Sequence, residues 1–78
     1  MSTIITAAAL KPGMTITGSV NIWDVVTPWE PRTVVRTRIN VHGYVQIDTG
    51  HTFELDGQPT TVWDEVAPWF RLTIADPA

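Results

Sequence analysis

The stretch MTITGSVNI, residues 14–22, alternates apolar and polar side chains without interruption. One face of this alternation carries Met14, Ile16, Gly18, Val20 and Ile22. A period of two is typical of a strand that buries one of its faces. A glycine on the buried face indicates a bulge or a sharp bend. The sequence therefore predicts a strand that turns a corner at Gly18, around which the rest of the fold is built.

The residues before this strand predict a turn and an earlier element. Pro12 and Gly13 fit the two central positions of a type II turn, because proline fixes the first φ angle and glycine accepts the positive second one. A strand over residues 3–8 should precede this turn. The AAAL segment, residues 7–10, fits one helical turn equally well, so both possibilities stay open.

Two runs after the strand predict a hairpin. TVVRTRINV, residues 33–41, alternates again, and YVQIDT, residues 44–49, follows the pair His42-Gly43. Because His-Gly reads as a tight turn, we expect the two runs to pair. The first run has two faces, one with Val35, Thr37, Ile39 and Val41 and the other with Val34, Arg36, Arg38 and Asn40.

The remaining residues predict a second hairpin and a final strand. HTFEL, residues 51–55, is expected to point Phe53 and Leu55 into the core. Asp56-Gly57 is the strongest turn signal in the chain and leads into TTVW, residues 60–63. FRLTIA, residues 70–75, is expected to be the last strand.

Together these segments predict an all-β domain that spans residues 1–78. Five to seven short strands with regular turn signals, and no strong helical periodicity, are typical of a small antiparallel barrel or sandwich. We favour the barrel, because closure leaves no sheet edge unpaired.

On these patterns the chain resembles SH3-like and Tudor-like small β-barrels over residues 10–63. LKPGMTITGSV, residues 10–20, is similar to the opening strand of such barrels, and VHGYVQIDTGHTFELDG, residues 41–57, is similar to their central meander. In length and composition the chain also resembles small accessory proteins of actinobacterial phages. That resemblance implies a viral protein that binds a host or phage protein in the host cytoplasm.

A second feature of the sequence is the pattern Trp-Asp-x-Val-x-Pro-Trp, which occurs at residues 23–29 and again at residues 63–69. The two copies hold all four tryptophans of the protein, and each copy is followed by an arginine, Arg32 or Arg71. Because proline cannot donate to a strand ladder, each copy is expected to form a strand, then a bend, then a tryptophan that folds back.

The aspartates of the two copies have two possible roles. Asp24 and Asp64 are expected to cap a turn or a short 3₁₀ segment at WDVV and WDEV. If the two copies meet in space, the same residues could instead form a carboxylate pair. The second copy continues with more apolar residues than the first, so we expect it to be the more buried of the two.

The tryptophans have three possible roles. In the first, they pack in the core and at the bends. In the second, at least one pair forms an exposed anchor with its arginine, because Trp and Arg dominate interface hot spots. In the third, the copies meet across a symmetry axis of a homo-oligomer. The candidate partner-binding residues are Trp23, Trp29, Arg32, Trp63, Trp69 and Arg71.

An alternative function is weak binding of nucleic acid. Arg36 and Arg38 share one strand face, and with Arg32 and Tyr44 they could form a stripe that contacts phosphates and stacks on bases. A solvated outer face explains the same arginines. The formal net charge of −3 argues against a large phosphate-binding surface.

Composition and motifs argue against several other kinds of site and function. The chain has no cysteine, and only His42 and His51 could serve as soft metal ligands, so neither disulfides nor a zinc site is expected. No catalytic motif or cofactor-binding motif is present, and we expect no enzyme activity. No run of about 20 apolar residues suits a membrane span, and the expected location is the cytoplasm.

Overall fold

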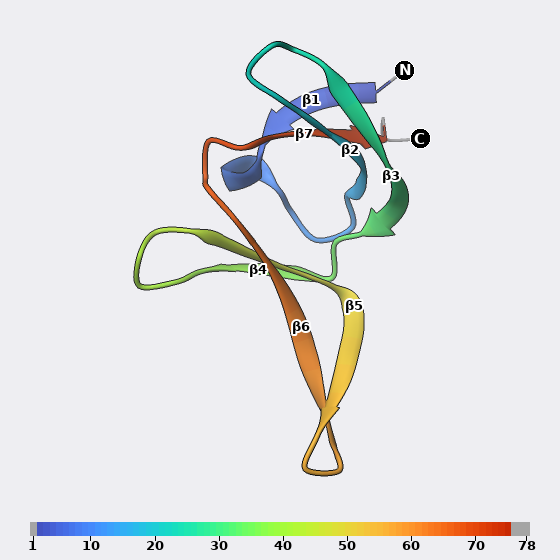
Figure 1. Ribbon diagram of the computed structural model, residues 1–78, viewed down its shortest axis with the longest axis vertical. Helices are drawn as coiled ribbons and strands as arrows, with labels where there is room; N and C mark the ends of the chain where they lie inside the picture. Colours follow the sequence, from blue (N-terminus) through green and yellow to red (C-terminus); the bar gives the residue numbers. More distant parts are fainter. Residues whose placement is uncertain (1, 76–78) are drawn as a thin grey trace.

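The computed structural model describes residues 2–75, which form seven strands and one 3₁₀ turn (Figure 1). The elements are β1 (Ser2–Thr6), η1 (Ala7–Ala9), β2 (Thr15–Val20), β3 (Val26–Thr33), β4 (Arg36–Ile39), β5 (Val45–Leu55), β6 (Gln58–Val66) and β7 (Arg71–Ala75). The prediction of an all-β chain is confirmed. The open question at residues 7–10 is settled as a short strand followed by a single 3₁₀ turn.

The strands form two antiparallel sheets. The first has the order β1-β7-β2-β3 and the second has the order β4-β5-β6. Both sheets are open, so the prediction of a closed barrel is wrong for residues 2–75. The reason is that β1 and β3 remain edges of the first sheet, while β4 and β6 remain edges of the second.

The core lies where the two sheets meet. Its buried side chains are Ala7, Leu10, Ile16, Val34, Val45, Ile47, Leu72 and Ile74. Val34 sits between β3 and β4, where the chain passes from one sheet to the other, and it is almost completely buried. Its N–H donates to the Met14 carbonyl at 2.8 Å, and its own carbonyl accepts from Gly13 N–H at 2.8 Å. This pair of bonds fixes the crossing point against the turn before β2.

That turn has the predicted form. Met14 N–H donates to the Lys11 carbonyl at 3.2 Å, and Gly13 has a φ angle of +92°. A positive φ at the third position of a turn is the mark of type II geometry and favours glycine. The turn therefore delivers the chain into β2 as the sequence predicted.

Gly18 marks the predicted irregularity in β2. The pairing of β2 with both β3 and β7 shifts register between Ile16 and Gly18. An added Cβ atom at Gly18 would lie 2.6 Å from the Thr27 carbonyl oxygen and 2.9 Å from Thr73 Oγ1. Both distances are shorter than a Cβ atom tolerates, so only glycine lets the neighbouring strands approach β2 this closely.

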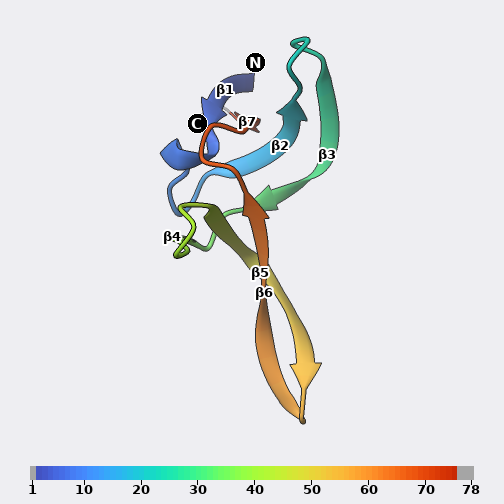
Figure 2. The same ribbon diagram turned by 60° about the vertical axis from the view of Figure 1, so that its left-hand side comes forward.

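The hairpin of β5 and β6 extends far beyond the core. β4 pairs only with residues 45–48 of β5, and the rest of the hairpin projects as a two-stranded ribbon (Figures 1 and 2). We call residues 50–59 the arm, and all of them are exposed. The turn at its end has positive φ angles at Asp56 and Gly57, of 51° and 76°, as a two-residue hairpin of type I′ requires.

The expected burial of Phe53 and Leu55 is wrong. Their side chains are 48% and 55% exposed. Phe53 pairs with Thr60 of β6, and Ile47 pairs with Asp64, which lies four residues further along β6. Because side chains alternate along a strand, Phe53 therefore lies on the same face as buried Ile47. The alternation predicted the correct face of the sheet for Phe53. The first sheet, however, does not extend far enough to cover that face along the arm.

Other expectations about burial also need correction. Ile22 is 82% exposed, because β2 ends at Val20 and a turn begins at Asn21. Val35 and Val41 flank β4 and are exposed as well, and Ile39 is exposed at the end of β4, which is an edge strand of the second sheet. The 3₁₀ turns expected at WDVV and WDEV are absent. The 3₁₀ turn among the described residues is η1.

Replacing Gly18 by alanine should destabilise the fold, because the new methyl group meets the β3 backbone at Thr27. We expect a loss of about 1–3 kcal/mol in the free energy of unfolding, measured by urea denaturation. The neighbouring variant Ser19→Ala adds no atoms and serves as the control. Equal unfolding midpoints for Gly18→Ala and the wild type would show that β3 moves aside without cost.

Candidate functional site

The two copies of the repeated pattern adopt different conformations. In the first copy, Trp23 and Asp24 belong to a turn, and Pro28 and Trp29 lie in β3. In the second copy, Trp63 and the following residues lie in β6, and the Pro-Trp pair forms a turn. The expected order of strand, bend and returning tryptophan therefore holds only for the second copy. Pro28 fits within β3 because that strand is an edge of its sheet.

The turn of the first copy is held by Asn21. Its side-chain oxygen accepts hydrogen bonds from Trp23 N–H at 2.9 Å and from Val25 N–H at 3.0 Å. Asp24 has a φ angle of 61°, a left-handed conformation that asparagine and aspartate tolerate better than most residues. The expected capping by the aspartate carboxylates is therefore wrong, because Asn21 supplies the acceptor for this turn.

Each aspartate of the repeat instead faces the arginine that follows the other copy. Arg71 Nη1 lies 2.6 Å from Asp24 Oδ1, and Arg71 Nη2 donates to the Asn21 carbonyl at 2.5 Å. Arg32 Nη1 lies 3.6 Å from Asp64 Oδ2. The copies do meet, as one alternative proposed, but through two reciprocal ion pairs and not through a shared carboxylate pair.

These two ion pairs join different parts of the fold. The Asp24–Arg71 pair links the β2–β3 turn to the start of β7 within the first sheet. The Arg32–Asp64 pair links β3 in the first sheet to β6 in the second. It lies beside a hollow of about 530 Å³ between the sheets, lined by Trp29, Glu30, Arg32, Asp64, Glu65 and Val66.

Each copy contributes one exposed and one half-buried tryptophan. Trp23 and Trp69 are 76% and 71% exposed. Trp29 packs against the core, and Trp63 is half-buried in β6. Over the whole pattern, residues 63–69 are more buried than residues 23–29, as predicted. The four tryptophans therefore divide between structural packing and exposure, and the division falls within each copy.

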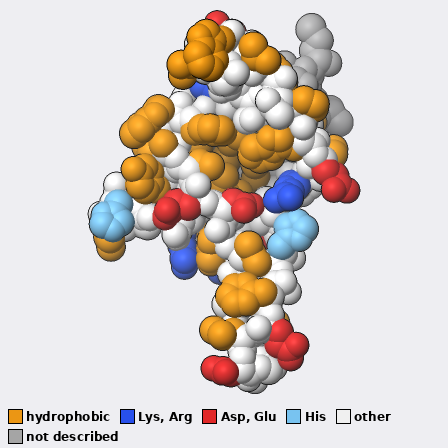
Figure 3. Space-filling model, viewed as in Figure 1, with side chains coloured by type: hydrophobic (Ala, Val, Ile, Leu, Met, Phe, Trp, Pro, Cys, Tyr) orange, Lys and Arg blue, Asp and Glu red, His pale blue; other side chains and the backbone are white. Residues whose placement is uncertain are grey.

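The exposed pair lies on one surface of the molecule. Ile22 and Trp69 line the same hollow, together with Phe70 and Arg71, and the Asp24–Arg71 ion pair holds the two segments together. Hydrophobic side chains gather over the β2–β3 turn and the β6–β7 turn on the face seen in Figure 3. We call this the tip surface, made of the exposed residues Ile22, Trp23, Val25, Trp69 and Phe70.

Sequence reasoning named two members of the tip surface and missed three. The alternation of residues 14–22 predicts a buried Ile22, because the apolar period of two continues through it. The signal that ends the strand is Asn21, an asparagine placed to accept hydrogen bonds from the next turn. The sequence does not indicate that Val25 and Phe70 are exposed, because an apolar residue beside a strand is usually buried.

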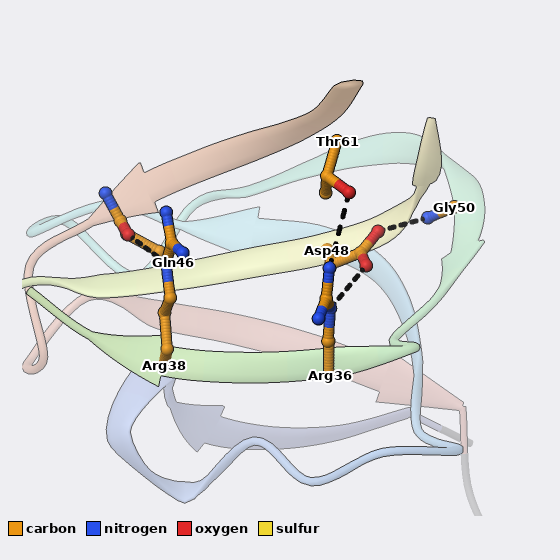
Figure 4. Close-up of polar contacts among 6 residues, drawn as sticks. All are labelled: Arg36, Arg38, Gln46, Asp48, Gly50 and Thr61. Carbon is orange, nitrogen blue, oxygen red and sulfur yellow. Dashed lines mark hydrogen bonds and ion pairs between the residues drawn. The ribbon is translucent and has the colours of Figure 1, made fainter. Parts of the chain in front are cut away.

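The outer face of the second sheet carries the arginines of the alternative hypothesis. Figure 4 shows Arg36 and Arg38 reaching from β4 across β5. Arg36 Nε donates to Asp48 Oδ2 at 2.9 Å, and Arg38 Nε donates to Gln46 Oε1 at 2.6 Å. Both guanidinium groups also lie over the ring of Trp63, at 4.8 Å and 3.9 Å from its centre.

The four residues of the proposed phosphate-binding stripe do not share a face. Arg32 bonds Asp64, whereas Arg36 and Arg38 stack over the neighbouring Trp63. Consecutive residues of a strand point to opposite sides of the sheet. Arg32 therefore lies on the other face of the second sheet. Tyr44 precedes β5, where its carbonyl accepts a hydrogen bond from Asn40 N–H at 3.0 Å.

Asp48 is the buried polar centre of this outer face. Its carboxylate accepts a hydrogen bond from Gly50 N–H at 2.8 Å as well as the bond from Arg36. The Gly50 backbone bond, followed by the bond from the Arg36 guanidinium, lowers the pKa of Asp48 below its usual value. Asp48 thus fixes β4 against β5 at the point where the arm begins.

Residues 2–75 contain neither a metal-binding cluster nor a membrane-spanning helix. Within residues 2–75 no group of three or more His, Asp or Glu side chains is close enough to hold a metal ion. His42 and His51 are both exposed. The described part of the chain contains no helix with the length and apolar character of a membrane span.

Comparison with protein-family models, with curated proteins and with solved structures finds no match to this chain.

Replacing Asp48 by asparagine should make stability less dependent on pH. The lowered pKa means that ionised Asp48 stabilises the fold above its unfolded-state pKa of about 3.9, and that this contribution is lost as the pH falls through the folded-state pKa. Urea midpoints should therefore be lower for Asp48→Asn at neutral pH, and the gap to the wild type should narrow below about pH 4.

The matched control for this experiment is Glu30→Gln, which removes an exposed carboxylate on β3. It should leave the pH dependence close to that of the wild type. A gap between Asp48→Asn and the wild type that stays constant from neutral to acid pH would contradict the assignment of this role to Asp48.

Proposed function

We propose that this protein is a non-enzymatic protein-binding module whose partner contacts the tip surface. The observation that carries the proposal is the exposure of Trp23 and Trp69 on two adjacent turns. Each tryptophan presents a large apolar ring to water, and burying such a ring is strongly favourable. A surface of this kind is typical of a contact site.

The surroundings of the two tryptophans support the same proposal. Asn21 holds the turn that carries Trp23, and Arg71 ties this turn to the segment that carries Trp69. An anchor that is held in place before binding loses less conformational entropy when the complex forms. The ion pair is itself exposed, so its role is to orient the two turns and not to contribute much stability.

The positions of the six candidate partner-binding residues reduce this set to fewer anchors. Trp29 packs against the core, Trp63 is covered by the Arg36 and Arg38 side chains, and Arg32 bridges the two sheets. We therefore assign partner binding to Trp23 and Trp69, with Arg71 as the residue that positions them. The SH3-like resemblance and the role of a phage accessory protein in a host cytoplasm stay predictions.

Binding through the tip surface should be lost when its aromatic rings are removed. Trp23→Ser and Trp69→Ser should each weaken the binding of a partner captured from native cell extract and then purified by about 30-fold, since hot-spot residues contribute about 2 kcal/mol or more. Calorimetric titration of the purified partner measures this change. Val41→Ser, which alters an exposed apolar residue in another loop, should bind normally.

Salt separates this function from the alternative. Contact through aromatic rings should change little in affinity as the salt concentration rises, whereas a site built on phosphate contacts weakens steeply. A partner that proves to be nucleic acid, is released by salt and still binds Trp23→Ser would reject the proposal.

A further inference from the structure

The arm presents an apolar face and an unpaired strand edge at the same place. Phe53 and Leu55 lie on the face that is buried further along the hairpin, yet both are about half exposed on the arm. A two-stranded hairpin without a covering layer is marginally stable in water. Figure 3 shows hydrophobic side chains along the arm, well away from the tip surface. The arm is therefore a second candidate contact surface, separate from the tip surface.

The free edge of the arm belongs to β5. On one side of β5, β6 pairs along almost the whole strand, but on the other side β4 pairs only as far as Asp48. Beyond that point, residues 51–55 have no neighbouring strand on the β4 side in either sheet. A strand added at this edge would pair with β5 in line with β4. Some proteins bind an extended segment of a partner by strand addition of this kind.

We propose that this edge pairs with the same edge of a second copy of the chain, antiparallel and centred on Phe53. Two identical antiparallel strands satisfy each other about a two-fold axis, which is the commonest symmetry of homo-oligomers. In this register Phe53 faces the partner copy's Phe53, and Leu55 faces the partner copy's His51. Aromatic pairs across strands stabilise such sheets.

Charge selects this register and this occupant. The carboxylate within residues 51–55 is Glu54, and centring on Phe53 places it opposite Thr52 of the second copy. Centring one residue later would set Glu54 against Glu54, which like charges disfavour. The chosen register also brings Asp56 opposite Gly50, at the base of the other arm.

The base of each arm carries a guanidinium group that suits this acidic tip. Thr52 pairs with Thr61, whose hydroxyl accepts a hydrogen bond from Arg36 Nη2 at 3.3 Å. The Arg36 side chain is 58% exposed even with Asp48 bonded to its Nε. Glu54 and Asp56 of one copy thus approach Arg36 of the other. The two-fold axis places the same contact at both ends of the paired strands. The complementarity favours a second copy over an unrelated strand.

The first test is sedimentation velocity across a wide range of protein concentration. The wild type should form a dimer, and Phe53→Lys should weaken dimerisation by more than about tenfold, because two ammonium groups would then face each other on the axis. Because Phe53 is exposed, this variant should keep its fold, which circular dichroism checks. Val41→Lys, with the same charge on another exposed loop, should dimerise normally.

The second test fixes the register and uses the absence of cysteine from the chain. Phe53→Cys should form a disulfide-linked dimer under mild oxidation, because directly opposed Cβ atoms lie near disulfide distance. A mixture of Thr52→Cys and Glu54→Cys should form the mixed dimer in preference to either homodimer. Equal amounts of all three products would reject the proposed register.

Three results would overturn the proposal. The first is a wild type that stays monomeric at every concentration. The second is a dimer that survives Phe53→Lys but is lost in Trp23→Ser, which would move self-association to the tip surface. The third is a monomer whose arm is needed only for binding another protein. This inference does not depend on the proposed function, because loss of partner binding in Trp23→Ser with an intact dimer would leave it standing.

Discussion

The close approach of three strands at Gly18 is the constraint on which the rest of this structure depends. β2 lies between β7 and β3, and at Gly18 it leaves no room for a side chain beside the Thr27 carbonyl and the Thr73 hydroxyl. The shift of register at this point bends β2 relative to both neighbours. The bend leads β2 into the turn at Asn21 and so places Trp23 beside the start of β7. The strand that bends at Gly18 is thus the one that leads into the turn carrying Trp23.

Local rules predicted much of the fold, because they act over a few residues. The strand over residues 15–20, the type II turn at Gly13, the bulge at Gly18 and the Asp56-Gly57 hairpin each follow from the conformational range of single residues. The exposure of Phe53 could not be predicted in this way. Alternation assigns a side chain to a face, but whether another layer covers that face depends on where a distant strand ends.

The repeated Trp-Asp-x-Val-x-Pro-Trp pattern shows even more clearly that local rules do not determine the structure of every segment. Identical residue types at identical spacing become turn and strand in one copy, and strand and turn in the other. The strand with which each copy pairs decides its conformation, since β3 pairs with β2 whereas β6 pairs with β5. The reciprocal ion pairs, Asp24 with Arg71 and Asp64 with Arg32, span long stretches of chain and have no local signature. The sequence does not separate the exposed tryptophans from those that pack against the fold, because only the three-dimensional context distinguishes them.

The pairing of β1 with β7 has a consequence for how the chain folds. Ser2 stands opposite Ala75, so strands from the two ends of the chain lie side by side in the first sheet. The second sheet, by contrast, consists of two successive hairpins that need only neighbouring segments. Contacts between distant residues form slowly because closing a long loop costs entropy. During synthesis the second sheet can assemble as soon as β6 emerges, whereas the first must wait for β7, and until then β2 and β3 carry an exposed apolar face without their central neighbour.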